Sequence, residues 1–566
     1  MAKLLITDSE SFFQSSVADA ECILISNTFF KIISRSSHLS ESDIFKINDS
    51  FIQERLLNEN DFFNKLNALT DASANIQHPF ISKNQSGIKG IVATLMWSFV
   101  EKKNFIEVLL KLLVSDNQYK KVKLHLSEVY KLLDLKDINS TPIESTFFID
   151  KKLRRRITRQ KVLNKAYLLF NLKRYLSSSS AKIAKRIIFL VQTAEHHHEL
   201  LNEVYKHFHK SKEVEPIVVY YPMYLGDDKK FRIHIPKGLI TRPIQDFRGL
   251  PSFVIPRKFI QSKISPGVID YPSVEANYTM MKNMLLELEP DVCVTVGYQD
   301  TGRYLADVCR AYDTPSVSID YSFITNDYTF NKEVEYDYKC TISNAQQEVW
   351  LKRNDPTHEF EVTGYLKYDK VKESPLSKEK FMGKYNLVPS NKTIFFASSH
   401  GYDPAIKRRM LAEISRLCIE QGFNLIVKTH PLEQDGIAKE QVRSKNQIVF
   451  SHSDLSAMEC VYYSDIVVSP GSSIVLDALY YGKPYITFSY SKSRVITDFM
   501  AISSEPFIFK ALNIEELKQQ IIQLDDETFL SKLTEKMDGV KERYLFKTDR
   551  KASQRVIELL ERIIGK

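Results

Sequence analysis

Two short polar segments, each directly after an apolar run, carry side chains suited to binding phosphate. The first is Lys428-Thr429-His430-Pro431, which follows the apolar run 425–427. Residues two apart on a strand share a face, so Lys428 and His430 can point the same way, and Pro431 ends the strand. A cation and an imidazole at a strand's carboxyl end can hold a phosphate or stabilise a departing one. A single histidine there is more often structural, but the second segment favours a binding role.

The second segment is Pro470-Gly471-Ser472-Ser473, which precedes a helical run that ends at Gly482-Lys483-Pro484. We expect Ser472 or Ser473 to cap that helix, so that its free backbone N–H groups and its dipole form an anion site. Asp477 lies one turn deeper on the same helix, where a carboxylate can accept ribose hydroxyls. The alternative is that the serines only cap the helix and Asp477 lies on the surface.

A third polar segment, Ser398-Ser399-His400, follows the apolar run 393–397. It is either a further contact to the same nucleotide donor or an ordinary polar turn. The donor site predicted from the three segments consists of Ser398, Ser399, His400, Lys428, His430, Pro431, Gly471, Ser472, Ser473 and Asp477. His430 is also a catalytic candidate, because it can stabilise the leaving phosphate.

Candidates for the acceptor side lie before residue 330. Transfer to a hydroxyl needs a general base, and Asp300 and Asp320 each follow a predicted strand; Asp320 is narrowly preferred. Glu195 and His196 open a predicted helix and either bind the acceptor or lie on the helix surface. The consecutive histidines 196–198 point in different directions, so they cannot form one metal site.

Strands alternate with helices from residue 186 onward, which predicts parallel sheets covered on both faces. In the first unit we expect strands at 187–191, 216–221, 291–296 and 316–319, with helices at 195–210 and 301–312. The pattern restarts with strands at 393–397, 424–428, 447–450, 465–468 and 485–488, and a helix at 407–421. Two successive units predict an α/β chain with two Rossmann-like domains and a cleft between them, where ligands bind at the strands' carboxyl ends.

The remaining segments complete the predicted domain organisation. Residues 1–150 open with strand-like runs at 4–7 and 23–26 and continue with helical periodicity, as at 105–114 and 122–133. They are predicted to form a mostly helical accessory domain. A basic linker at 151–185, an acceptor domain at 186–370, a nucleotide-donor domain at 371–548 and a closing helix at 549–566 follow.

Composition narrows the class of protein. The chain has 566 residues, 43% of them hydrophobic, and its 17 glycines form no GxGxxG or Walker motif. Six scattered cysteines without a CxxC pair, and no apolar leader, favour the cytoplasm. No DxD-like motif is present in the predicted cleft loops, so we expect no essential metal and no other cofactor.

Charge is concentrated in one segment. The net charge is +8, and residues 151–186 contain 13 Lys or Arg and no acid. This segment is either a solvated linker helix or a contact to an anionic surface, such as the inner face of the cell membrane. A nucleic-acid partner is not expected, because the rest of the chain is net negative.

Five runs together resemble the GT-B glycosyltransferases of bacterial surface polysaccharide synthesis: 360–365, 428–431, 465–473, 482–484 and 549–555. That group includes capsule Kdo transferases and polysialyltransferases, which use CMP-sugars, and CDP-glycerol glycerophosphotransferases. UDP-N-acetylglucosamine 2-epimerases share the fold. The resemblance covers about residues 186–566. It implies that His430, Ser472 and Ser473 contact donor phosphate and that Asp477 holds the ribose.

Two departures from the resembled families guide the choice of substrate. Asp320-Tyr321 stands where glycerophosphotransferases often carry His-Gly, and residues 299–302 only loosely match the acidic motif of CMP-sialic-acid-type enzymes. A carboxylate base favours a CMP-activated acidic sugar (Kdo, sialic acid or a related nonulosonate), transferred to a polysaccharide or glycolipid of the capsule or lipopolysaccharide. The alternatives are a CDP-glycerol glycerophosphotransferase, an enzyme like the much shorter UDP-sugar 2-epimerases, and a catalytically silent assembly subunit.

Overall fold

The computed structural model describes most of the chain from residue 185 to residue 565, and five strands before it. The undescribed residues within this range are 193–194, 222–230, 248–270, 298–299, 322–333, 353–354, 356, 372–375, 400–403, 431–432, 434–435, 443, 452–453, 491–501, 503–504 and 506. Residues 151–184 of the linker predicted at 151–185 also lie outside the described residues. Lys185 and Arg186 open β6 (Lys185–Gln192) and pair with Asp291 and Glu215.

The first Rossmann-like domain is built on a seven-stranded sheet in the order β12-β11-β10-β9-β6-β7-β8. All its strand pairs are parallel. Its strands are β6 (Lys185–Gln192), β7 (Val214–Tyr221), β8 (Ile240–Pro243), β9 (Val292–Val296), β10 (Ser316–Ile319), β11 (Tyr338–Thr341) and β12 (Glu359–Val362). Its helices are α6 (Glu195–Lys210), α7 (Tyr271–Leu288), α8 (Asp300–Ala311) and α9 (Asn344–Lys352). Five consecutive residues of β6 are buried, as expected for a parallel strand covered on both faces.

The second Rossmann-like domain has a six-stranded parallel sheet in the order β15-β14-β13-β16-β17-β18. Its strands are β13 (Thr393–Ala397), β14 (Asn424–Lys428), β15 (Gln447–Phe450), β16 (Ile466–Ser469), β17 (Tyr485–Phe488) and β18 (Ile508–Ala511). Its helices are α10 (Lys378–Lys384), α11 (Pro404–Glu420), α12 (Gly436–Gln441), α13 (Ala457–Tyr463), α14 (Ile474–Tyr480), α15 (Ile514–Gln523) and α16 (Glu527–Leu545). This strand order is that of dinucleotide-binding folds, so the prediction of an α/β chain with two Rossmann-like domains is confirmed.

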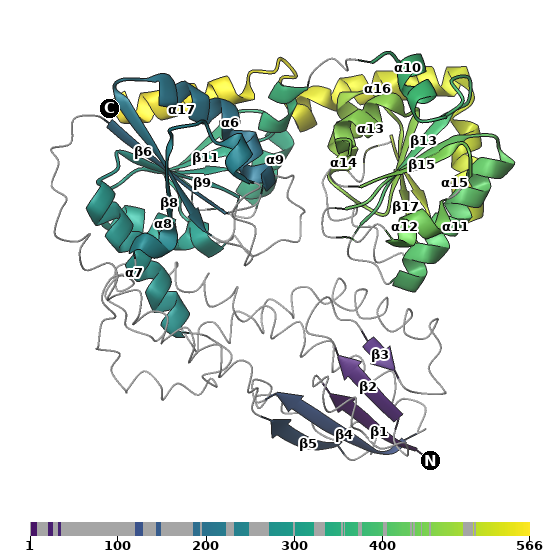
Figure 1. Cartoon of the computed structure of the whole chain (residues 1–566), viewed down its shortest axis with the longest axis horizontal. Helices are drawn as coiled ribbons and strands as arrows, with labels where there is room; N and C mark the ends of the chain where they lie inside the picture. The colour runs from purple at the N-terminus through teal and green to yellow at the C-terminus, as the bar shows by residue number, and fades with distance from the viewer. Residues whose placement is uncertain are drawn as a thin grey trace.

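The chain crosses between the two domains twice (Figure 1). The short 3-10 helix η6 (Leu366–Lys370) leads into the second domain, and α17 (Ala552–Gly565) returns to the first. The apolar face of α17 packs with α6 and the first sheet through residues such as Val556 and Leu560. Arg555 donates to the carbonyl of Thr363 at 2.9 Å, which fixes α17 beside the outgoing crossover.

Five strands are described within residues 1–150, and they form one sheet; the mostly helical character expected of this region stays a prediction. The strands are β1 (Ala2–Thr7), β2 (Glu21–Ile25), β3 (Ile32–Ser34), β4 (Tyr119–Ser127) and β5 (Ile143–Phe148), in the order β3-β2-β1-β4-β5. The strands predicted at 4–7 and 23–26 are confirmed. The helix predicted from residue 122 is wrong over β4, where polar and apolar residues alternate from Lys121 to Leu126 with the period of a strand. The helix predicted at 105–114 lies outside the described residues.

No helix that the structure describes combines the length and the apolar character needed to cross a bilayer.

Candidate functional site

The polar segments predicted to bind the donor meet at the carboxyl edge of the second sheet. Ser398 follows β13, His430 lies just beyond β14, and Gly471 follows β16. Strand β13 pairs with both β14 and β16, so the three segments are neighbours. The order of the chain reverses between β13 and β16, which is the position where open α/β sheets bind ligands.

A buried glutamate, which the sequence reasoning missed, ties two of these segments together. One carboxylate oxygen of Glu433 accepts the backbone N–H of His430 at 2.9 Å. The other accepts the hydroxyl of Ser398 at 3.2 Å and pairs with the ammonium of Lys407 on α11. The Glu433 side chain is only 5% exposed. An acid three residues after His430 was the only signal in the sequence, and neither helical nor strand periodicity marks it.

Lys428 extends sideways to the neighbouring strand end. Its ammonium donates to the carbonyl of Ser451, just after β15, at 3.0 Å. The backbone N–H of Thr429 donates to Phe450 at 3.2 Å, which continues the pairing of β14 with β15. Lys428 therefore fixes the edge of the sheet in this structure, and its contact with a donor stays a prediction.

The loop after β16 has the geometry of a tight strand-to-helix turn. Gly471 adopts a φ of 106°, in the left-handed region that favours glycine. The hydroxyl of Ser472 accepts the N–H of Ile474 at 3.4 Å, a weak form of the expected cap. Ser473 occupies the position before α14, but it has helical backbone angles and its side chain caps nothing. The capping prediction therefore holds for Ser472 only.

Asp477 is bound to this chain's own crossover. Its carboxylate accepts the ammonium of Lys367 at 2.6 Å and the hydroxyl of Tyr368 at 3.2 Å, both from η6. The side chain is 1% exposed, so the alternative of a surface residue is wrong. These contacts give Asp477 a structural role at the domain crossover, and ribose binding stays a prediction.

Asp320, the preferred base, is turned into the core of the first domain. It is 2% exposed, and its carboxylate accepts the indole N–H of Trp350 at 2.9 Å. Burial raises its pKa from 3.8 to about 7, while the positive charge of Lys339 and the bond from Trp350 oppose the rise. A carboxyl whose pKa lies near neutrality suits a general base. The contacts described for the Asp320 carboxylate are with side chains of this chain, so they do not show where an acceptor substrate binds.

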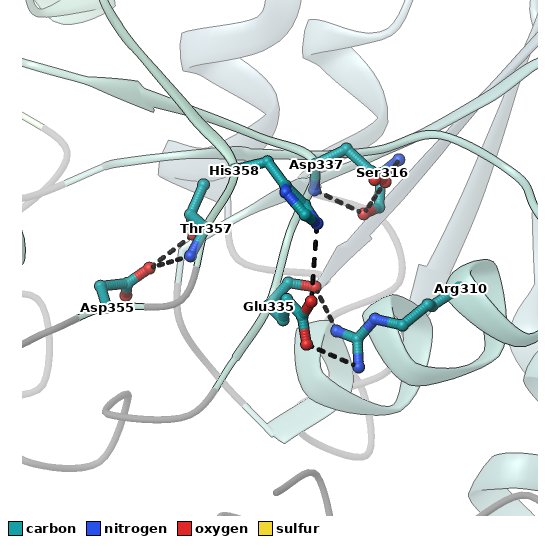
Figure 2. Close-up of polar contacts among 7 residues, drawn as sticks. All are labelled: Arg310, Ser316, Glu335, Asp337, Asp355, Thr357 and His358. Carbon is teal, nitrogen blue, oxygen red and sulfur yellow. Dashed lines mark hydrogen bonds and ion pairs between the residues drawn. The ribbon is translucent and has the colours of Figure 1, made fainter. Parts of the chain in front are cut away.

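The neighbours of Asp320 form a buried charged network. The ammonium of Lys339 pairs with Asp355 and lies 3.9 Å from the ring centre of Trp350. Desolvation lowers the pKa of Lys339, and the charge of Asp355 opposes this. The other oxygen of Asp355 accepts the N–H and the hydroxyl of Thr357, as Figure 2 shows.

A second polar group in Figure 2 surrounds the amino ends of β10 to β12, at the opposite edge of the sheet from Asp320. Arg310 pairs with Glu335 at 3.0 Å, and Glu335 lies 3.5 Å from the imidazole of His358. Asp337 accepts the N–H and the hydroxyl of Ser316, both at 2.8 Å. These contacts hold the strand starts together, so we assign them a structural role.

A histidine that was not singled out lies beside Tyr321, the residue after Asp320. His197 is 1% exposed, and its ring centre is 4.7 Å from that of Tyr321. Gly297, after β9, has a φ of 78°, and a Cβ there would lie 2.6 Å from the Tyr321 ring. The first turn of α6 and the end of β9 therefore pack around Tyr321, which follows β10. The position of His197 shortly after β6 was its signal in the sequence.

Several predicted residues fall outside the described part. Glu195 and His196 open α6 and Asp300 opens α8, but their side chains are not described. The same holds for His400 and Pro431, whereas Ser399 is described as half-buried. Within the described residues, no group of three or more His, Cys, Asp or Glu side chains could hold a metal ion. The absence of an essential metal stays a prediction.

Comparison with known families gives one match. Residues 317–562 match the family model described as CDP-Glycerol:Poly(glycerophosphate) glycerophosphotransferase. The matched part runs from β10 through the whole second domain and into α17. The match indicates a transferase that uses a nucleotide-activated donor, as the sequence predicted. It agrees with the CDP-glycerol alternative and does not show the Kdo transferases or polysialyltransferases that we first expected.

Solved structures resemble the chain at low sequence identity. The S. aureus MnaA–UDP co-structure is 14% identical, covers 67% of this chain and 97% of its own, and has a TM-score of 0.48. The UDP-GlcNAc 2-epimerase from Neisseria meningitidis is 13% identical, with coverages of 67% and 100% and a TM-score of 0.47. The wall teichoic acid polymerase TagF is 15% identical, with coverages of 73% and 98% and a TM-score of 0.45. No curated protein sequence matches the chain.

Proposed function

We propose, with the glycerophosphotransferase match as the premise, that this chain transfers a glycerol-phosphate-type group from a CDP-activated donor to a hydroxyl of a bacterial surface polymer or glycolipid. The observation that carries the proposal is the match of residues 317–562, because it includes every described strand-end segment of the predicted donor site. The Rossmann strand order of the second domain supports a nucleotide ligand at that edge.

The proposed reaction is a phosphoryl-group transfer. The acceptor hydroxyl oxygen forms a bond to the donor's β-phosphorus, the bond from that phosphorus to the bridging oxygen of CMP breaks, and a base takes the hydroxyl proton. Negative charge builds up on the departing CMP, so hydrogen-bond donors fixed in advance stabilise the transition state. We assign His430 and the backbone N–H groups around Gly471–Ser473 as the hydrogen-bond donors that stabilise the departing CMP.

For the base we propose Asp320, with Asp300 as the second choice. A pKa of about 7 means that a large fraction of Asp320 is ionised near neutral pH, while the group remains basic enough to accept a proton. Both residues stand at the carboxyl edge of the first sheet, after β10 and β9.

Transfer of a CMP-activated acidic sugar is the second candidate. Asp320 favours it, because the glycerophosphotransferases that this chain resembles often have a histidine at that position. Both reactions release CMP, but only the first makes a phosphodiester. The chemical nature of the product therefore separates them.

Thermal unfolding in the presence of nucleotides tests the proposed donor. A ligand at about 100 times its Kd adds about 2.7 kcal/mol of stability, so CDP-glycerol, CDP or CMP should raise the Tm. The variant His430→Ala should unfold at the wild-type temperature without ligand and show a smaller shift with CDP-glycerol. Stabilisation by UDP and UMP alone, or an undiminished shift in His430→Ala, would contradict the assignment.

We also propose that the basic segment 151–186 holds the enzyme at the anionic inner face of the cell membrane, near its acceptor. Of its 13 positive charges, Lys185 and Arg186 pair with Asp291 and Glu215. The others, with no acid among them, support this, since each Lys or Arg near such a surface adds about 1 kcal/mol. Co-sedimentation with phosphatidylglycerol vesicles, but not with phosphatidylcholine vesicles, is expected. Equal binding to both, or to neither, would contradict it.

A further inference from the structure

We infer that Glu433 is the positioning residue of the donor site: its carboxylate sets the mutual placement of the segments after β13 and β14. This inference rests on the proposed function, because it takes the donor to bind at the carboxyl edge of the second sheet. It assigns Glu433 no direct contact with the donor.

Three hydrogen-bond donors, from three segments of the chain, converge on the Glu433 carboxylate. The His430 N–H occupies one oxygen at 2.9 Å. The Ser398 hydroxyl, at 3.2 Å, and the Lys407 ammonium share the other. The carboxylate thus joins the end of β13, the end of β14 and the first turns of α11. Two of its partners, Ser398 and His430, are residues that we assign to the binding site of the nucleotide donor.

Only a carboxylate satisfies all three donors. A glutamine would offer one acceptor oxygen, and its NH₂ group would face either the His430 N–H or the Lys407 ammonium, both of which are donors. The side chains of Glu433 and Lys407 are 5% and 14% exposed, so little water is available to replace a lost bond. Loss of the charge therefore leaves either the His430 N–H or a mostly buried cation without its acceptor.

The opposite edge of the same sheet offers a matched control. Asp465 accepts the Thr393 N–H at 2.8 Å with one oxygen and the Lys378 ammonium at 2.7 Å with the other. It joins the starts of β13 and β16, away from the predicted donor residues. The same kind of contact therefore occurs once beside the proposed site and once far from it.

The experiment compares Glu433→Gln with Asp465→Asn in the full chain. We measure Tm, the Kd for CDP-glycerol and for CDP by calorimetry, and the rate of CMP release. Both variants should lose thermal stability. Glu433→Gln should weaken donor binding about tenfold or more, the equivalent of roughly 1.4 kcal/mol, while Asp465→Asn binds like the wild type. Unchanged affinity in Glu433→Gln, or an equal loss in Asp465→Asn, would overturn the inference.

A double variant separates positioning from simple destabilisation. Glu433→Met combined with Lys407→Met removes both the carboxylate and the unpaired cation, so we expect Tm to lie above that of Glu433→Gln while donor affinity stays low. Recovery of affinity together with Tm would refute a positioning role. If the wild type binds UDP in place of CDP-glycerol and CDP, the proposed donor is wrong, and the same comparison made with UDP still tests Glu433. Binding of no nucleotide would contradict both.

Discussion

At the scale of single residues, polar side chains at the two carboxyl edges have different surroundings. In the second domain, Ser398 and His430 meet around Glu433. In the first, Asp320 follows β10, and its carboxylate accepts the indole N–H of Trp350 on α9. The sequence placed Asp320 correctly after a strand. The sequence could not show toward which face of the sheet the Asp320 side chain points, or which helix covers that face.

The raised pKa of Asp320 predicts a pH-dependent stability. Its pKa is 3.8 ordinarily and about 7 in the fold, so the folded chain retains a proton that the unfolded chain loses. The contribution of Asp320 to the free energy of unfolding is therefore complete below about pH 4, declines as pH rises, and is lost above about pH 7. Urea unfolding of the wild type and Asp320→Asn across this range should show a difference that changes with pH. A constant difference would refute the raised pKa.

The same variant tests the proposed base. Asp320→Asn keeps the size of the side chain and an acceptor for the Trp350 N–H. It should lower CMP release by about a hundredfold or more while the Kd for CDP stays unchanged. An active Asp320→Asn would move the base to Asp300 or to another residue.

At the scale of elements, the contact between α14 and η6 connects the predicted donor loop to the domain crossover. Asp477 binds Lys367 and Tyr368, and Tyr368 stacks on Tyr480 with 4.5 Å between ring centres. Asp477 lies only four residues after Ser473, on the helix that follows the loop. The sequence suggested that Asp477 binds a ribose, because it could not show that η6 packs against α14.

A double-variant cycle decides between the two roles of Asp477. If the crossover contact dominates, Asp477→Asn and Lys367→Met should each lower the free energy of unfolding by about 1 kcal/mol, and the double variant should lose little more. The Lys367 side chain is 34% exposed, so solvent limits the effect. Additive losses, or a weaker Kd for CDP in Asp477→Asn alone, would instead favour the ribose role.

The order of strands across each sheet explains which elements could be read from the sequence. Strands β10, β13, β14, β15 and β17 have the predicted bounds, because the central ones are short, continuous apolar runs. Strands β8, β11, β12 and β18 were not identified. All four contain charged or polar residues, and β8, β12 and β18 also lie at sheet edges. An edge strand has one partner, so its sequence is less constrained and its pattern is weaker.

At the scale of the whole molecule, the family match and the domain structure do not coincide. The match begins within β10, so it covers the second domain and only the last strands of the first. Strands β6 to β9 and the N-terminal sheet lie outside it. The predicted donor segments therefore have support from both motif and family. On the acceptor side, Asp320 and Tyr321 lie within the match, while Asp300 and the strands from β6 to β9 lie outside it.

The central claim is that a glycerol-phosphate-type group is transferred from a CDP-activated donor. Phosphorus NMR of a reaction containing the full chain, CDP-glycerol and a glycerol-phosphate oligomer tests it most directly. We predict that the diphosphate signals of CDP-glycerol disappear while CMP and new phosphodiester signals grow in equal amounts. Intact CDP-glycerol, alongside CMP release from a CMP-activated acidic sugar without any phosphodiester, would contradict the claim.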